Sequence, residues 1–192
     1  MHTLPPHFTA VPLDKSYRLL NHGPTVIVSA RHAGEHNAMS AAWACALDFA
    51  PPKVTVVLDK ATRTRALVEG SGFFALQLPT VPMAALTKAI GTDSAVTMPD
   101  KLRRHGVQLF DAPGLDIPLV EGCAAWLACR LITEPHNQQA YDLFIGEVVA
   151  AWADDRVFRD GHWQFGTAPA ELRTLHYVAG GQFYAIGESV VV

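Results

Sequence analysis

The chain has 192 residues, of which 49% are hydrophobic and 17% are charged, and its formal net charge is −3. A small negative charge, with no basic run longer than Arg103-Arg104, argues against nucleic acid and anionic membranes as partners. No uncharged apolar run approaches the roughly 20 residues that span a bilayer. Since a chain of this length is most easily one domain with a continuous core, we expect a single domain over residues 1–192 that acts on small molecules.

The N-terminal segment lacks the basic start, apolar core and small-residue cleavage site of a secretory signal. We therefore expect a cytoplasmic protein. Its early prolines predict an extended arm over residues 1–15. The cysteines are odd in number and form no C-x-x-C pair, so we expect small buried thiols rather than a disulfide framework or a zinc site. These cysteines are Cys45, Cys123 and Cys129.

Segments rich in β-branched and aromatic residues predict strands. In chain order they span residues 25–30, 54–58, 73–78, 125–132, 143–152 and 182–186. Gly34 predicts a turn after the first of these strands, and Asp160-Gly161 is a strong hairpin signal. Many strands joined by turns favour an antiparallel sheet.

Short helices are predicted between these strands. They span residues 64–69, 83–90 and 99–105, and each is expected to end at the glycine that follows it, namely Gly70, Gly91 or Gly106. None resembles the long crossover helices of a parallel sheet. The pattern therefore predicts a mainly β protein, an antiparallel barrel or sandwich with a few short helices.

The stretch HNAMSAAWACALDFAPP, residues 36–52, carries one formal charge and many small side chains. As a helix it would place Met39, Trp43 and Leu47 on one face, and its alanines favour that interpretation. As a strand it would present an almost flat face, along which a planar ligand could approach the backbone. Propensity alone favours the helix, and both interpretations stay open at this point.

The segment DKATRTRALVEGSG is the strongest local signal for an anion. Thr62 and Thr64 stand at the start of a predicted helix, where free backbone N–H groups face outward, and Arg63 and Arg65 lie beside them. Basic residues at a helix N-terminus oppose the helix dipole, and a bound phosphate would resolve that conflict. The alternative is a threonine N-cap followed by solvated arginines.

Other familiar sites are not supported. The chain has neither a phosphate-binding loop motif nor a dinucleotide-binding glycine motif. His32 and His36 are separated by the turn at Gly34, and no third ligand has recognisable spacing, so we expect no metal site. No nucleophile elbow marks a reactive serine.

The ordered segments together resemble the flavin reductase-like family, whose FMN-binding split-barrel members include flavoredoxins. The segments that carry the resemblance are GPTVIVSA, HNAMSAAW, PPKVTVVLDKATRTRALVEGSGFFALQLP, PDKLRRHG, PLVEGCAAWLACRL and YDLFIGEVV. The resemblance implies an antiparallel split β-barrel of Greek-key type, a homodimer, and FMN bound without covalent attachment near the subunit interface. The three valines that end the chain would either cover a partner subunit or finish a strand.

The resemblance also implies positions for the cofactor. The N-x-M-[ST] segment would lie along the flavin ring, and its residues here are Asn37, Ala38, Met39 and Ser40, with Trp43 following as a ring contact. The hydroxyl residues that hold the phosphate correspond to Thr62 and Thr64, with Arg63 and Arg65 beside them.

Two further positions follow from the same resemblance. Lys101 resembles a family lysine that reaches toward the cofactor. Many members have a histidine where this chain has Asp142, and His136, six residues earlier, is the nearest substitute for a contact to the flavin.

The implied activity is hydride transfer from NADH or NADPH to the flavin, followed by electron transfer to an acceptor or a redox protein partner. The hydride itself requires no side-chain acid or base, so no catalytic residue is assigned. The alternatives are a non-enzymatic FMN-holding electron carrier, and a split-barrel protein that holds another ligand in the same cradle.

Overall fold

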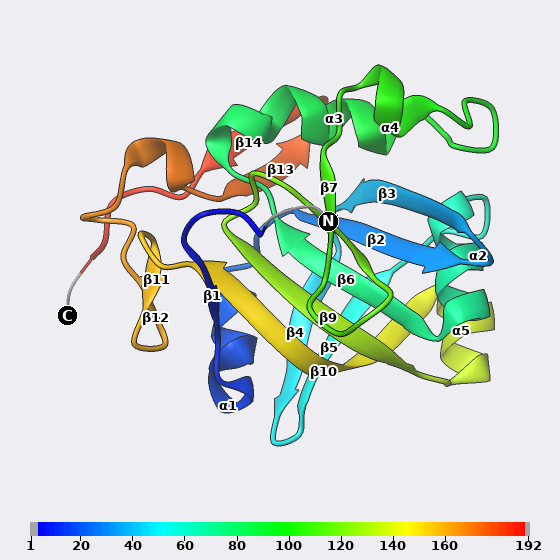
Figure 1. Cartoon of the computed structure of the whole chain (residues 1–192), viewed down its shortest axis with the longest axis horizontal. Helices are drawn as coiled ribbons and strands as arrows, with labels where there is room; N and C mark the ends of the chain where they lie inside the picture. The colour runs from blue at the N-terminus through cyan, green and yellow to red at the C-terminus, as the bar shows by residue number, and fades with distance from the viewer. Residues whose placement is uncertain (1–3, 191–192) are drawn as a thin grey trace.

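The main sheet is antiparallel throughout, and its strands follow the order β3-β2-β6-β9-β10-β5-β4, with β1 added on β10 (Figure 1). The computed structural model describes residues 4–190. The strands of this sheet are β1 (Phe8–Ala10), β2 (Val26–His32), β3 (Glu35–Ala41), β4 (Ala44–Phe49), β5 (Pro52–Val57), β6 (Phe73–Leu78), β9 (Ala125–Ile132) and β10 (Leu143–Asp154).

Smaller elements decorate the sheet. Three hairpins pair β7 (Leu109–Asp111) with β8 (Pro118–Val120), β11 (Phe158–Arg159) with β12 (His162–Trp163), and β13 (Leu175–Ala179) with β14 (Gln182–Ala185). The α-helices are α1 (Leu13–Ser16), α2 (Arg63–Ser71), α3 (Ala84–Thr92), α4 (Lys101–Arg104) and α5 (Pro135–Tyr141), and short 3-10 turns span Tyr17–Leu19, Val81–Met83 and Ala170–Leu172. None of the helices in the described residues 4–190 has the length and apolar character needed to cross a membrane.

The sheet curls around one core. Alternate residues of β5 and β10, including Val54, Val56, Phe144 and Val148, are buried in it, and Leu67 of α2 packs onto the same cluster. Side chains of β3 and β4 reach this cluster although the two strands stand at opposite ends of the strand order. The sheet therefore forms a barrel that is open between β3 and β4. The expected mainly β, antiparallel architecture with a few short helices is confirmed.

A second cluster packs on the outer face of β6 and β9. Trp126 and Ala128 of β9 contribute to it, together with Ile90 of α3, Leu102 of α4 and Leu119 of β8. This cluster fixes α3 and α4 over one side of the barrel, beside β2 and β3 (Figure 1).

The stretch at residues 36–52 is extended, and the helix that alanine propensity favours is wrong. It forms β3 and β4, with β3 paired to β2 and β4 paired to β5. Ala33 and Gly34, both with positive φ, make the turn into β3. Tertiary pairing overrides propensity here because small side chains fit between the barrel core and the elements outside it.

The predicted ends of two helices are wrong because two glycines serve packing instead of capping. Gly70 lies inside α2, where a Cβ would stand 2.5 Å from the Cδ2 atom of His32. Gly91 lies inside α3, where a Cβ would collide with the Oγ atom of Ser40. The left-handed residue that ends α2 is Gly72, whereas Gly106 follows α4 in a left-handed conformation as expected.

Three other expectations concern the N-terminal arm, the terminal valines and the cysteines. The arm is not extended throughout, because the helix α1 begins at Leu13. Phe8, in the extended part of the arm, stacks on Trp152. Residues 1–3 of that arm and the last two valines, 191–192, lie outside the described residues. Cys123 and Cys129 are buried as expected, but Cys45 is exposed because its side chain points outward from β4.

Candidate functional site

A direct hydrogen bond joins β3 to α2. The Asn37 side-chain amide donates to the Thr64 hydroxyl oxygen at 2.9 Å, and both side chains are buried. Because the Thr64 oxygen accepts this hydrogen bond, the hydroxyl proton of Thr64 remains available to a different partner. Asn37, which the family resemblance places along the flavin ring, and Thr64, which it places on the phosphate, are therefore neighbours.

The N-terminus of α2 has no side-chain cap. Thr62 occupies the N-cap position in an extended conformation, but its hydroxyl donates to the Asp59 carbonyl oxygen at 2.7 Å instead of accepting from the helix. The free backbone N–H groups of the first turn, together with the helix dipole, attract an anion. Arg63, at the first helical position, is paired with Glu35 of β3, which reduces its charge toward a ligand.

Lys101 supplies a buried positive charge opposite this helix start. Its side chain is 2% exposed, and its Nζ atom donates to the carbonyl oxygens of Ile90 at 2.8 Å and Asp93 at 2.9 Å, at the end of α3. Burial lowers the pKa of Lys101 to about 8, although the nearby Asp93 carboxylate raises it. The ammonium stabilises the carbonyl end of α3 and remains mostly protonated at neutral pH.

These groups surround one cavity of about 90 Å³, the α2 cavity, between β3, α2 and the end of α3. Six of the sequence-predicted residues line it, namely Asn37, Met39, Thr62, Arg63, Thr64 and Lys101. They come from three separate parts of the chain. The hydroxyl residues Thr92 and Ser94 also line it; they were not predicted, although the run of small polar residues after Gly91 could have indicated them.

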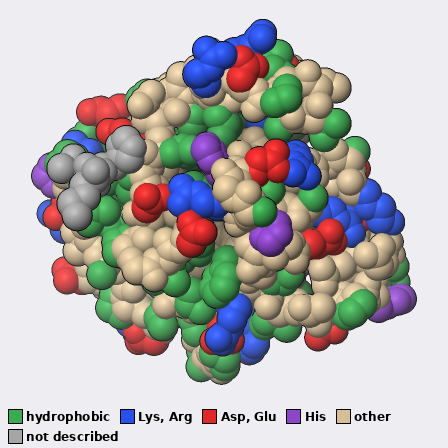
Figure 2. Space-filling model, turned by 45° about the vertical axis from the view of Figure 1, so that its right-hand side comes forward, with side chains coloured by type: hydrophobic (Ala, Val, Ile, Leu, Met, Phe, Trp, Pro, Cys, Tyr) green, Lys and Arg blue, Asp and Glu red, His purple; other side chains and the backbone are tan. Residues whose placement is uncertain are grey.

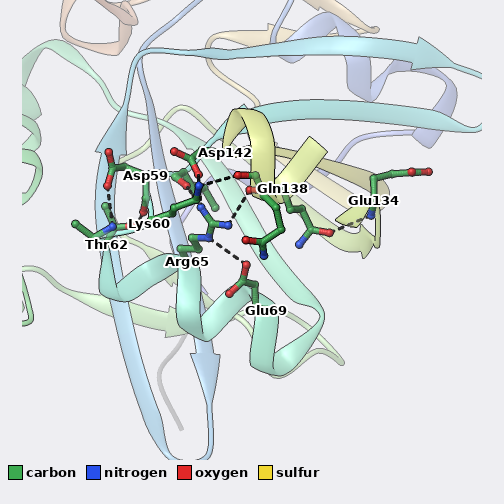
Figure 3. Close-up of polar contacts among 11 residues, drawn as sticks. Asp59, Lys60, Thr62, Arg65, Glu69, Glu134, Gln138 and Asp142 are labelled. Carbon is green, nitrogen blue, oxygen red and sulfur yellow. Dashed lines mark hydrogen bonds and ion pairs between the residues drawn. The ribbon is translucent and has the colours of Figure 1, made fainter. Parts of the chain in front are cut away.

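Arg65 lies away from the α2 cavity, in a cluster that joins α2 to α5 and β10 (Figure 3). Its guanidinium donates to the Asp142 carboxylate at 2.5 Å, to the Glu69 carboxylate at 3.0 Å, and to the Gln138 carbonyl oxygen at 2.8 Å. It also lies over the Phe144 ring, 5.1 Å from the ring centre. With these acceptors engaged, Arg65 is a buried structural cation.

Asp142 has a structural role as the partner of Arg65. This residue adopts a left-handed conformation at the end of α5, and its carboxylate is the partner of Arg65. His136 is exposed on α5, where its ring packs edge-on against Tyr141 at 5.5 Å. The structure places His136 on neither cavity described in this section.

The remaining predicted residues occupy three different environments. Ala38 is buried in the outer core cluster, and Trp43 is 74% exposed at the corner between β3 and β4. Ser40 lines a second cavity of about 260 Å³, the hairpin cavity, which lies between the end of β3, α3 and the β13–β14 hairpin. Gly91 and Thr92, at the end of α3, line both cavities, so the two cavities adjoin there.

The charged side chains elsewhere do not form a patch of one sign on the face shown in Figure 2, where basic and acidic groups are interspersed. Many are paired with each other, as Arg31 is with Asp111 and Asp116. The described surface on this face offers no extended basic track. The two adjoining cavities are the candidate site because they bring together seven of the sequence-predicted residues, six in the α2 cavity and Ser40 in the hairpin cavity.

The geometry defines an antiparallel β-barrel protein in which an uncapped helix start, a buried lysine and a strand of small residues border one small cavity. Comparison with known proteins makes the assignment more specific. The flavin reductase like domain matches residues 17–182, and the chain belongs to that family. The family resemblance and the split-barrel fold expected from the sequence are confirmed.

One similar solved structure is a crystal structure of an FMN-binding domain of a flavin reductases-like enzyme from Shewanella baltica OS155. Its sequence is 59% identical to this chain, and the two structures superpose with a TM-score of 0.96 over 99% of this chain and 100% of that chain. The uncharacterized protein YddH of Escherichia coli (strain K12) is 40% identical over 95% of this chain and 97% of its own length. Flavoredoxin of Desulfovibrio vulgaris (Miyazaki F) is 23% identical, with a TM-score of 0.75 over 88% of this chain and 90% of that chain, which shows a shared fold.

Proposed function

We propose that this protein binds FMN without a covalent bond, accepts a hydride from NADH or NADPH on the flavin, and passes electrons to an acceptor or a redox protein partner. The observation that carries the proposal is the α2 cavity, where the uncapped start of α2, the Thr64 hydroxyl and the buried Lys101 ammonium converge. Such donors are the ones that a phosphate group binds. The Shewanella baltica relative, described as FMN-binding, supports the same ligand.

The chain's own residues would bind and orient this cofactor. Bound FMN would supply a conjugated ring that accepts a hydride. Lys101 and the start of α2 would hold the phosphate, and the Asn37–Thr64 hydrogen bond would direct the remaining hydroxyl proton toward it. The small side chains at the end of β3 leave room for a planar group beside the backbone. No side chain of this site has to give or take a proton for the hydride to move.

We also propose a homodimer, formed through the outer face of β4. This strand stands at one end of the strand order, and its outward side chains alternate with those that pack on the core. Trp43 is 74% exposed, Leu47 is 52% exposed and Phe49 is 67% exposed on this side. An apolar row of this kind is typical of a surface that a partner covers. The second copy is the partner that the family resemblance implies.

We propose the cytoplasm as the location. The three cysteines are free thiols in the described structure, and free thiols persist in a reducing compartment. A cytoplasmic location would also give access to nicotinamide nucleotides.

Anaerobic mixing of the FMN-loaded protein with NADH, and separately with NADPH, tests the proposed hydride transfer. The oxidised flavin absorbance should bleach with at least one of the two nucleotides. If neither nucleotide bleaches a flavin that dithionite reduces, the reductase activity is excluded and the protein is an FMN-holding electron carrier. Riboflavin-loaded and FMN-free protein serve as the controls.

A further inference from the structure

The hairpin cavity is walled by elements far apart in the chain. The end of β3 forms one side, α3 forms another, and the β13–β14 hairpin closes the third, next to α3 in Figure 1. Tyr177 and Phe183 bring two aromatic side chains to it, one from each strand of the hairpin. Aromatic side chains pack well against planar conjugated groups. The cavity has the walls that a flat ring requires.

Two glycines allow the walls of this cavity to approach one another closely. A Cβ at Gly91 would collide with Ser40, so only glycine lets α3 approach β3 so closely there. Gly181 has a φ of +81°, and a Cβ at that position would stand 2.7 Å from the Nζ atom of Lys88. The hairpin tip therefore lies directly against the Lys88 ammonium.

Lys88 is the one charged side chain among the residues that line the hairpin cavity. Within residues 4–190, the lysines that form ion pairs are Lys15, Lys53 and Lys60, and no carboxylate lies within ion-pair distance of Lys88. Lys88 is exposed at the edge of the cavity, so water screens part of its charge. A cation in this position still stabilises negative charge that develops inside the cavity.

We propose that the hairpin cavity receives the isoalloxazine ring of FMN, and that Lys88 stabilises the negative charge that this ring gains on reduction. A hydride brings two electrons and one proton, so its transfer converts the neutral oxidised ring into a reduced anion while the nicotinamide leaves as its oxidised cation. The inference rests on the proposed function, with the phosphate in the α2 cavity and the ring in the hairpin cavity, which shares Gly91 and Thr92 of α3 with it.

The midpoint potential of the FMN-loaded protein tests this assignment, measured by spectroelectrochemistry in the wild type and in Lys88→Met. Removing the exposed cation should lower the preference for reduced over oxidised FMN by about three- to tenfold, a shift of about 15–30 mV to more negative potential for a two-electron couple. Lys88→Arg should stay close to the wild type. Lys15→Met, which removes an equal charge on α1, is the matched control and should not shift the potential.

The pH dependence of the potential gives a second readout. A flavin that takes up two electrons and one proton changes by about 30 mV per pH unit, and one that takes up two protons changes by about 59 mV. The wild type should show the smaller slope near neutral pH, and Lys88→Met should move toward the larger one, because the reduced ring then binds a second proton more readily.

The outcomes separate the two proposals. A wild-type protein that takes up no FMN overturns both of them. If FMN binds in preference to riboflavin, but Lys88→Met leaves both the potential and its pH slope unchanged, the ring assignment fails and the proposed function stands. An equal shift in Lys15→Met would likewise overturn the specific role of Lys88.

Discussion

The Asn37 amide and the Thr64 hydroxyl are hydrogen-bonded at 2.9 Å in the interior of the protein, and this bond connects β3 to the start of α2. Because the hydroxyl oxygen accepts the bond, its proton is oriented by a fixed partner and remains available to a ligand. One contact thus joins the strand that borders both cavities to the helix whose free N–H groups attract an anion.

Replacing Thr64 by valine should weaken FMN binding more than riboflavin binding, since only FMN carries the phosphate. Loss of a hydrogen bond to a charged group costs about 1.5–3 kcal/mol, so the FMN affinity should fall by about tenfold or more. Fluorescence titration with the two flavins measures the difference. Thr64→Ser retains the hydroxyl and should keep most of the preference for FMN. An equal loss for FMN and riboflavin in Thr64→Val would contradict the phosphate assignment.

The preference for FMN should also decrease in alkaline solution because of Lys101. Burial lowers the pKa of this group to about 8, so its ammonium loses its charge above that pH in the ligand-free protein. The ratio of FMN to riboflavin affinity should therefore be smaller at about pH 9.5 than at about pH 7. In Lys101→Met the ratio should be low at both values. A ratio that stays constant in the wild type would exclude Lys101 as a phosphate ligand.

Arg65 should contribute to stability rather than to phosphate recognition. Removing one partner of a buried ion pair costs roughly 3–5 kcal/mol, and Asp142 is partly exposed, so Arg65→Met should lie at the lower end of that range. Chemical denaturation measures this loss. The double variant Arg65→Met with Asp142→Asn should lose less than the two single changes added together. A stable Arg65→Met protein with a reduced preference for FMN over riboflavin would show that Arg65 contacts the phosphate after all.

His22 should make the protein less stable in mild acid. It is packed among Trp163, Phe165 and His176, and burial, with a smaller contribution from His176, lowers its pKa from 6.5 to about 4. The unfolded chain takes up a proton below pH 6.5 while the folded protein does not until about pH 4, so stability is lost between these values as the pH falls.

Denaturation at two pH values measures this effect. The free energy of unfolding should fall by about 2 kcal/mol more in the wild type than in His22→Phe between about pH 7 and about pH 5. The phenylalanine variant keeps an aromatic ring in the same surroundings and removes the titration. The same pH dependence in both proteins would assign the effect to other groups.

Leu47→Asp should convert the proposed homodimer into a monomer. A charge placed on the apolar outer face of β4 would have to be buried without a partner when the two copies meet. Sedimentation velocity measures the state. Val96→Asp adds the same charge at a side chain that is 62% exposed elsewhere and should leave the dimer intact. A wild-type monomer, or a Leu47→Asp dimer of unchanged stability, would contradict this interface.

The strands that run through the core could be predicted closely from the sequence. The strand bounds at residues 73–78 and 125–132 agree with β6 and β9, because both are runs of mostly apolar residues that the two core clusters bury. The stretch at residues 36–52 was ambiguous because alanine favours a helix in isolation, and only pairing with β2 and β5 makes it extended. Gly70 and Gly91 marked close packing that no local pattern distinguishes from a helix end.

The candidate site was predictable to the extent that its residues carry a local signal. Thr62, Thr64 and Asn37 belong to short recognisable segments, and they do line one cavity. Arg65 carried the same signal as Arg63, but its partner Asp142 comes from a distant part of the chain, so its burial could not be foreseen. Lys88 has no local signal at all, because the cavity around it is completed only by the C-terminal hairpin.

Uptake of FMN by the purified protein, followed by visible absorption and by calorimetric titration with FMN and riboflavin, tests the proposed cofactor site most directly. We expect a flavin spectrum, about one FMN bound per chain, and a clear preference for FMN that Thr64→Val reduces. A colourless protein that binds no added FMN, or that binds riboflavin as tightly as FMN, would contradict the assignment of the α2 cavity as the phosphate site.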